Sequence, residues 1–208
     1  MGVNINGKTF LSGHINGQTL AKAVINGNTV YEGIKTTTLT FNDFLFYERL
    51  RKHVGGYAWA GYTTRARGGF GVPDGNVDLG QVGKIDLGSN YGYRRVITRY
   101  VKPDIDVSKI IKVTLQASTT SGAVLTNYVT DNFTWSNGQS GYDAASVSML
   151  TMENEAAYDI TEAYQAIIES GTDYIYLKFI HPNNENNLSD TVTWSTTFYM
   201  PTIIIEHR

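Results

Sequence analysis

The sequence of 208 residues contains no cysteine, which excludes disulfide bonds, thiol catalysis and the commonest zinc cages. Only 17% of the residues are charged, the formal net charge is −2, and no basic run occurs. Nucleic-acid binding, in which Lys and Arg neutralise phosphates, is therefore disfavoured. No apolar stretch approaches the roughly 20 residues of a membrane span. The start, MGVNINGKTF, has no cationic segment followed by an apolar one. We therefore expect a chain made in the cytoplasm without a signal peptide, with neither nucleic acid nor a membrane as its partner.

Known catalytic motifs are also missing, including the nucleophile elbow, the phosphate-cradling loop and the metal-protease helix. Glycoside hydrolysis needs two carboxylates in one cleft, but the candidate carboxylates are scattered over segments that we expect to be loops. These candidates are Asp104, Asp106, Asp131, Asp143, Glu153 and Glu155. His53 and His181 have no catalytic partner that the sequence identifies. The sequence therefore indicates a protein that is not an enzyme.

Aromatic, β-branched and small polar residues are abundant instead. The chain is 41% hydrophobic and includes 14 Tyr, 8 Phe and 3 Trp. These residue types suit pleated, half-buried strands. The length suits one large β domain, or one domain with a small appendage. We predict an all-β protein.

A short phrase recurs at a spacing of ten residues near the start of the chain. Ile-Asn-Gly occurs at 5–7, 15–17 and 25–27, and a Thr follows each Gly by two places. Asn-Gly favours a two-residue type I′ turn between antiparallel strands, so residues 1–35 are predicted to form a ribbon of short hairpins. Because such a ribbon buries little apolar area alone, we expect it to dock on a partner or another subunit. The alternative is that it caps an open edge of the main domain.

Residues 36–208 read as a succession of strands separated by turns. The predicted strands are 57–66, 93–101, 109–118, 123–135 and 173–181, followed by two near the C-terminus that Pro201 separates. Alternation assigns an inward face to two of these strands. Its members are Ile111, Val113, Leu115 and Ala117 in one strand, and Ile175, Leu177 and Phe179 in the other. The Gly-rich segment 68–90 is predicted to be a long loop or irregular hairpins.

One helix is predicted over residues 159–171. Asp159 has the position of an N-cap with Glu162 three residues later, as in a capping box, and Gly171 supplies a C-terminal stop. An apolar stripe at helical spacing consists of Ile160, Tyr164, Ile167 and Ile168. We predict that this helix seals one end of the core. Trp135 and Trp194 fall in strand patterns and are also expected in the core.

The segment YRRVITRYVKPDIDVSKIIKVTLQAS (93–118) resembles a pattern of DNRLRE-type sandwich domains, in which an arginine-bearing strand, an Asp loop and an alternating strand follow one another. Later phrases occur in the order that such domains show, at 132–143, 157–179 and 195–207. These domains are similar to carbohydrate-binding modules of jelly-roll form. The resemblance implies a jelly-roll-like β-sandwich with one short helix over residues 36–208. The Arg-Leu-Arg-Glu motif itself is absent, and Arg94, Arg95 and Arg99 stand only loosely in its place.

The repeat VNINGKTF…VINGNTVYEG (3–33) resembles short phrases in the tail, baseplate and receptor-binding proteins of phages that infect Gram-positive bacteria. In those proteins such ribbons join a carbohydrate-binding head to the virion. The resemblance implies a location in the virion tail or baseplate. Residues 1–35 would then be the connector to other tail or baseplate proteins, and residues 36–208 the head that binds a bacterial surface polysaccharide. We expect a homo-oligomer, with a trimer favoured, because many weak sites acting together supply avidity.

Two other functions stay open. The chain is a structural tail or baseplate protein if the same face serves protein packing and binds no glycan. It is the detached carbohydrate-binding module of a polysaccharide-degrading enzyme if its native partner is a catalytic domain. A trimer favours the virion functions, and a monomer favours the detached module.

Sugar-binding sites need accessible aromatic faces and a few fixed polar groups. The densest candidate set is Tyr57, Trp59 and Tyr62 with Arg65 and Arg67. Alternation places Tyr57 and Trp59 on one face, which Tyr62 joins only through a bulge near Gly61. The two arginines are candidates for gripping hydroxyls or an anionic group. The alternative is that Trp59 belongs to the core.

Two further candidate sites lie elsewhere in the chain. Tyr91, Tyr93 and Arg94 mark a loop-to-strand junction, and loops on a rigid scaffold commonly carry binding residues. An ordinary strand edge is the alternative there. The polar run 181–187 contains His181, Asn183 and Asn184, and its alternative is a solvated turn.

No resident cofactor is expected. Asp74, Asn76 and Asp78 present oxygen ligands of the kind that Ca²⁺ takes, which makes calcium the one alternative. The spacing departs from an EF-hand loop, and a Pro-Asp-Gly turn explains residues 73–75 without a metal. We prefer the turn.

Overall fold

The computed structural model describes residues 3–5, 8–10, 14–15, 18–19, 22–25, 28–53, 57–65, 79–86, 90–183 and 193–208. Six short strands come first: β1 (Val3–Ile5), β2 (Lys8–Phe10), β3 (His14–Ile15), β4 (Gln18–Thr19), β5 (Lys22–Ile25) and β6 (Asn28–Glu32). The next five are β7 (Lys35–Leu39), β8 (Asp43–His53), β9 (Tyr57–Arg65), β10 (Leu79–Asp86) and β11 (Asn90–Val101). The rest are η1 (Val107–Lys109), β12 (Ile110–Val129), α1 (Gly138–Asp143), β13 (Ser146–Asp159), α2 (Thr161–Glu169), β14 (Tyr174–Ile180) and β15 (Trp194–His207).

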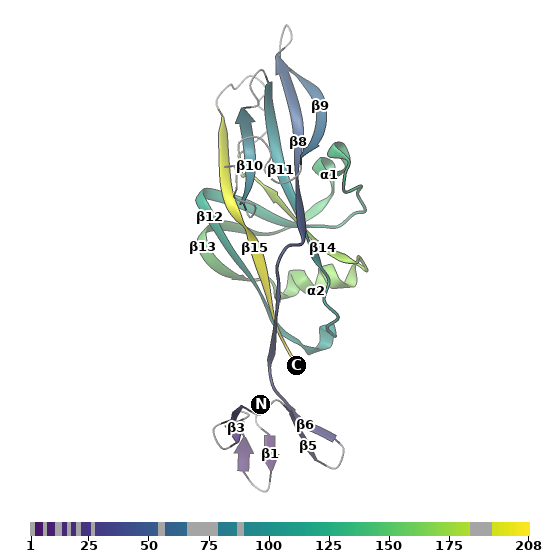
Figure 1. Ribbon diagram of the computed structural model, residues 1–208, viewed down its shortest axis with the longest axis vertical. Coiled ribbons are helices and arrows are strands. Elements are labelled where there is room, and N and C mark those ends of the chain that lie inside the picture. Colours follow the sequence, from purple (N-terminus) through teal and green to yellow (C-terminus); the bar gives the residue numbers. More distant parts are fainter. Residues whose placement is uncertain are drawn as a thin grey trace.

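Nine antiparallel strands pair in one sheet that closes on itself (Figure 1). The ring runs through β10, β15, β12, β14 and β11, and β11 pairs back with β10. Strands β8 and β9 extend the sheet from β11, while β13 lies beside β12 and β7 beside β15. The 20 residues of β12 join the two halves, because they pair first with β15 and then with β14. The predicted all-β, sandwich-type fold is confirmed.

The interior of the ring holds the main apolar core. Ile175, Leu177 and Phe179 of β14 are each 0% exposed, so their predicted inward face is confirmed. Val113, Leu115 and Ala117 of β12 are buried as well, but Ile111 is 40% exposed. The register between β12 and β15 shifts between Ile110 and Lys112. A bulge at this point takes Ile111 out of the alternation.

Helix α2 covers one end of this core, as its apolar stripe predicts. Ile160, Tyr164 and Ile167 belong to the core and Ile168 packs against it, and burying each such side chain contributes about 1.5–3 kcal/mol. Gly171 has φ +75° just beyond the helix, as expected of a C-terminal stop. The capping box is wrong, because Asp159 is still paired with Thr114 in the sheet and Ile160 is the N-cap.

Pro201 does not separate two strands, because β15 continues through it. The register between β15 and β12 shifts between Gln116 and Ser118, opposite Met200 and Pro201. On the other edge, the pairing with β10 ends at Tyr199 and the pairing with β7 begins at Ile203. Proline is tolerated at a bulge because no ladder hydrogen bond needs its missing N–H.

Four elements differ from the predictions. Strand β10 lies within the Gly-rich segment 68–90, where a loop or irregular hairpins were expected. Its apolar residues miss the period of two because Gly83 has φ +116° in mid-strand. The strand at 123–135 ends at Val129 as the last part of β12, so Trp135 lies in a turn. Strand β13 and helix α1 have no counterpart among the predictions.

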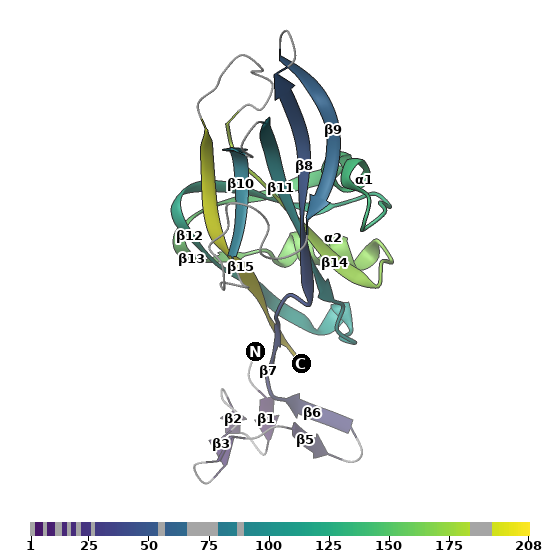
Figure 2. The same ribbon diagram turned by 45° about the horizontal axis from the view of Figure 1, so that its top comes forward.

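The repeat at the start of the chain forms hairpins. Strands β1–β2, β3–β4 and β5–β6 make three two-stranded sheets. The innermost pairs are Ile5 with Lys8, Ile15 with Gln18 and Ile25 with Asn28, which leaves two residues in each turn, as Asn-Gly predicts. Figures 1 and 2 show these hairpins beyond the sandwich, joined to it through β7 at the end where the C-terminus emerges.

Candidate functional site

The outer face of the sheet, which is the side of β8, β11 and β14 turned away from the ring interior, carries a second buried cluster. Tyr47, Tyr93 and Ile97 point to this side and are at most 1% exposed. Residues 130–145, including α1, lie over them and contribute Tyr142 and Ala144 to the cluster. Thr130 N–H donates to the Ala145 carbonyl at 3.0 Å and so closes the base of this covering segment. An irregular segment therefore buries a sheet face that alternation alone would leave exposed.

Charged side chains of the sheet hold the covering segment in place. The Lys178 ammonium donates to the carbonyls of Tyr142 and Ala144 at 2.7 and 2.6 Å, and the Arg95 guanidinium donates to the Tyr142 carbonyl at 2.7 Å. The Tyr47 hydroxyl donates to the Trp135 carbonyl. Lys178 is 1% exposed, and its two charge-assisted bonds offset the cost of burying an ammonium. These contacts make the covering segment a fixed wall.

Glycine lets α1 approach the sheet. A Cβ placed on Gly141 would overlap the Tyr47 ring, and one on Gly138 would lie 2.7 Å from the Thr63 backbone carbonyl carbon. Neither position has room for a side chain without displacing the helix. The seat of α1 on β8 and β9 therefore depends on these two residues.

Four aromatic rings gather where the covering segment meets β14. This aromatic platform consists of Phe133, Trp135, Tyr174 and Tyr176. The Tyr176 ring centroid lies 5.1 Å from Phe133, 5.8 Å from Trp135 and 5.9 Å from Tyr174, all within the usual range for aromatic pairs. The Arg99 guanidinium lies over both Trp135 and Tyr174, at 4.6 and 5.2 Å from the ring centroids. Arg99 also pairs with Asp43 at 3.3 Å.

A pocket of about 540 Å³ opens beside this platform. The covering segment supplies Asp131, Asn132 and Phe133, the turn after α2 supplies residues 170–173, and β14 supplies Tyr174 and Tyr176. We call it the platform pocket. Burial raises the pKa of the Tyr176 hydroxyl, so this ring keeps its neutral form. The pocket combines aromatic faces with carboxylate, amide and hydroxyl groups.

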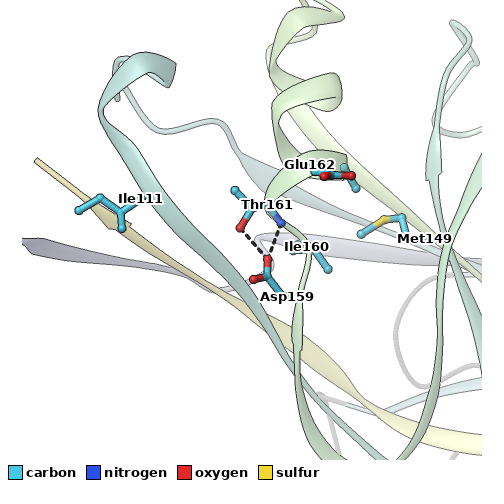
Figure 3. Close-up of a pocket in the computed structure, with 7 residues that line it drawn as sticks. Ile111, Met149, Asp159, Ile160, Thr161 and Glu162 are labelled. Atoms are coloured by element: carbon cyan, nitrogen blue, oxygen red, sulfur yellow. Dashed lines mark hydrogen bonds between the residues drawn. The ribbon is translucent and has the colours of Figure 1, made fainter.

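A second pocket of about 500 Å³ lies at the start of α2 (Figure 3). Asp159 accepts hydrogen bonds from the Thr161 hydroxyl at 2.6 Å and from its backbone N–H at 3.0 Å, and these bonds hold the pKa of Asp159 below its ordinary value. The Thr161 hydroxyl oxygen also accepts from the Val113 N–H. Ile111 and Met149 form apolar walls. These polar groups tie the helix to β12, so we assign the pocket a structural role.

The structure places the predicted row Tyr57, Trp59 and Tyr62 on β9. The register of β8 with β9 shifts between Leu50 and Arg51, and Gly61 has φ +133°. Tyr57, Trp59 and Tyr62 therefore stand opposite His53, Arg51 and Arg49, which are alternate residues of β8. The register shift is a bulge at the position near Gly61 where one was expected. The side chains of Tyr57, Trp59 and Arg65, and all of Arg67, lie outside the described residues.

Tyr62 itself is part of the packing around α1. Its ring lies 5.5 Å from Tyr142 in an edge-on contact, and Arg49 lies over it at 5.8 Å. Burial raises the pKa of the Tyr62 hydroxyl, and Asp143 adds to the rise. The ring is half-buried, so only part of its surface is open to a ligand.

The junction of Tyr91, Tyr93 and Arg94 does not form an accessible site. Tyr93 is 1% exposed beneath Trp194, so its ring offers no free face. Arg94 points into the ring interior, where it pairs with Glu48 at 2.6 Å. Tyr91 is half-buried, with the Lys84 ammonium 5.2 Å from its ring centroid. The expectation of a binding cluster here is corrected, because alternation in β11 sends Arg94 inward and Tyr93 is buried in the outer cluster, where its ring contacts Trp194.

His181 and Asn183 of the third predicted site form a local turn. The His181 ring packs on Trp194 at 4.7 Å, and its Nδ1 accepts from the Asn183 N–H at 3.0 Å. Burial lowers the pKa of His181.

Asn184 lies outside the described residues, as do Asp74, Asn76 and Asp78 of the calcium alternative. In the part of the chain that the structure describes, no group of three or more His, Asp or Glu residues is placed to hold a metal ion, and no helix there has the length and apolarity needed to cross a membrane.

The sequence analysis did not predict the aromatic platform, although the alternation of residues in β14 already indicates part of it. The alternation that places Ile175 and Leu177 inward also places Tyr174 and Tyr176 outward. Two tyrosines on the outer side of one strand are a readable sign of an aromatic surface. Phe133 carries no such sign, because it lies in an irregular segment.

Neither a scan against models of known protein families nor a search of curated proteins finds a match for this chain. The resemblances described above stay predictions.

Proposed function

We propose that the chain binds a bacterial surface polysaccharide without catalysis and that the platform pocket is its site. One observation supports this most: Phe133, Tyr174 and Tyr176 line a single pocket together with the oxygen-bearing side chains of Asp131 and Asn132. Aromatic faces stack on the C–H-rich sides of sugar rings, while a few fixed polar groups orient the hydroxyls. The volume of about 540 Å³ falls within the roughly 300–1,000 Å³ of small-ligand sites. The Thr130 N–H bond to the Ala145 carbonyl and the Tyr47 hydroxyl bond to the Trp135 carbonyl flank residues 131–133. They hold this wall of the pocket before any ligand arrives, which lowers the entropic cost of binding.

The proposal includes a place in a phage tail or baseplate. Three hairpins of short strands precede a large β-sandwich, an arrangement that fits a connector and a head. The hairpins would dock on other tail or baseplate proteins, and an oligomer such as a trimer would supply avidity for a repeating polysaccharide. A structural virion protein and a detached binding module remain the alternatives.

The test compares wild type and variants on cell-wall polysaccharides from a panel of Gram-positive bacteria. Tyr174→Ala removes one platform ring and is expected to weaken binding about ten-fold, since a stacked ring contributes about 1.4 kcal/mol. Tyr199→Ala is the matched control, because Tyr199 is 46% exposed on β15 and lines neither of the two pockets. Trp59→Ala tests the β9 row as a competing position.

Each outcome distinguishes between the platform pocket, the β9 row and a structural role. Loss of binding in Tyr174→Ala alone supports the platform pocket. Loss in Trp59→Ala alone keeps the function and moves the site to β9. Absence of binding by the folded wild-type protein across the panel overturns the proposal and favours the structural role.

Glycoside hydrolysis is the second candidate function, and one observation favours it. Asp131 and Asp173 line the same pocket, although the sequence showed no such pairing. Two carboxylates in one cleft are the minimum for this chemistry. Both are exposed, whereas a general acid usually needs an apolar environment that keeps it protonated, so we prefer binding. Mass spectrometry of the bound oligosaccharides over time tests this directly, since shortened products that disappear in Asp131→Asn would establish catalysis.

A further inference from the structure

The platform pocket has a charge character that restricts its ligand. Asp131 and Asp173 stand at its walls, and none of the described residues that line it is Lys or Arg. Its other polar side chains belong to Asn132, Ser170 and Thr172. A ligand in this pocket therefore meets two carboxylates and electron-rich ring faces.

Two cations on or just after β11 are already engaged. Arg99 pairs with Asp43 at 3.3 Å while lying over Trp135 and Tyr174. The Lys102 ammonium donates to the Ile168 carbonyl at 3.0 Å, near the C-terminus of α2. The position of Arg99 over Tyr174 is consistent with the attraction between a cation and a ring quadrupole.

We propose that the platform pocket selects glycans that carry a protonated amino group, as free hexosamines do, over glycans that carry carboxylate or phosphate groups. This inference rests on the proposed glycan-binding function and names the class of glycan. An ammonium group donates hydrogen bonds to the carboxylates and interacts favourably with the faces of the tyrosines. A uronate or phosphate group instead meets like charge at Asp131 and Asp173.

The experiment measures affinities of the full chain for a glucosamine hexamer, its fully N-acetylated counterpart and an oligogalacturonate. Measurements at pH 6 keep the sugar amine protonated, since an ordinary amino group has a pKa of about 8. We expect the amine form to bind roughly five-fold more tightly than the acetylated form, because partly exposed ion pairs and cation–π contacts are individually modest. In 1 M salt the preference should shrink, because the screening length falls to about 3 Å.

Variants connect the preference to the pocket. Asp131→Asn with Asp173→Asn should abolish the roughly five-fold preference and leave the two hexamers with equal affinity. Asp104→Asn is the matched control, because Asp104 is an exposed carboxylate that lines neither pocket. A carboxylate-dependent preference for the amine supports the inference.

Three other results overturn the inference. Equal or tighter binding of the acetylated hexamer or the galacturonate leaves glycan binding standing without the amine selectivity. The same holds if neither hexamer binds while a panel polysaccharide does. Absence of binding by every hexamer and every panel polysaccharide removes the proposed function as well.

Discussion

The ring interior and the outer face share strands β8, β11 and β14 but differ in chemistry. On β11, Val96 and Tyr100 point inward into an apolar core, whereas Arg95 and Arg99 point outward and lie over the rings of Tyr142 and Trp135. The interior is closed by strand pairing and α2. The outer face is closed by the covering segment, which Lys178 and Arg95 help to hold, and by Trp194 over Tyr93. Where that cover ends, the aromatic platform is left open.

This comparison shows two ways to bury a sheet. Alternating apolar residues suit the interior, because paired strands satisfy their backbone hydrogen bonds through the ladder itself. The outer face instead needs side-chain donors for the carbonyls of an irregular segment, and Lys178 and Arg95 supply them. Covering the outer face in this way requires donors at defined positions. It also leaves aromatic side chains exposed at the edge of the covering segment, where a ligand can bind.

The interior contains a buried ion pair, Arg94 with Glu48, which provides the largest expected effect. Arg94 and Glu48 are 1% and 0% exposed, and Arg94 also donates to Gln81 at 2.8 Å. Glu48→Ala leaves a guanidinium in the core without its carboxylate, and we expect a loss of about 4 kcal/mol in the free energy of unfolding, measured by urea denaturation. Glu153→Ala on the exposed side of β13 is the control. The double variant Glu48→Leu with Arg94→Met should lose less than the single one, and an equal or greater loss would contradict this account.

Lys178→Met tests whether charge holds the cover on the outer face. The change removes the ammonium that donates to the carbonyls of Tyr142 and Ala144 and keeps an apolar side chain of similar length. We expect the free energy of unfolding to fall by about 3 kcal/mol. The near-ultraviolet circular dichroism of the aromatic residues should weaken at the same time. Lys112→Met, an exposed lysine of β12, is the control. Unchanged stability would mean that packing alone secures the covering segment.

Gly141→Ala tests how closely that cover must approach the sheet. Its new methyl group would overlap the Tyr47 ring, and overpacking of this kind costs about 2 kcal/mol. Gln139→Ala in the same helix is exposed and should be neutral. If glycan binding falls along with stability in Gly141→Ala, the covering segment positions the platform pocket.

His181 provides the smallest effect, which is visible through pH. Its folded-state pKa is lowered by burial, so the unfolded chain binds the proton more readily. The stabilising contribution is complete above the ordinary pKa of about 6.5 and is lost as pH falls from there towards the folded-state value. Denaturation midpoints of wild type should decline over this window more than those of His181→Gln. Parallel declines would show that other groups carry the pH dependence.

Several features were predictable because their causes are local. Asn-Gly predicts the hairpin turns, the period of two predicts the inward face of β14, and the apolar stripe predicts the buried side of α2. The bulge at Gly61 was also predictable. Strand β10 was not, because Gly83 breaks its alternation, and the strand pairing of β13 has no local signature that distinguishes it from a loop.

By itself the sequence determined the all-β class, the hairpins and the inward faces, since each depends on residues that are close together in the chain. Only the tertiary structure decided the platform pocket, because Asp131, Phe133, Thr172 and Tyr176 come from separate segments that meet through the pairing of β12 with β14 and the fixed cover. The burial of Tyr93 and the pairing of Arg94 with Glu48 were decided there too. Accessibility and charge pairing depend on which segment covers a face, and no periodicity within one strand carries that information.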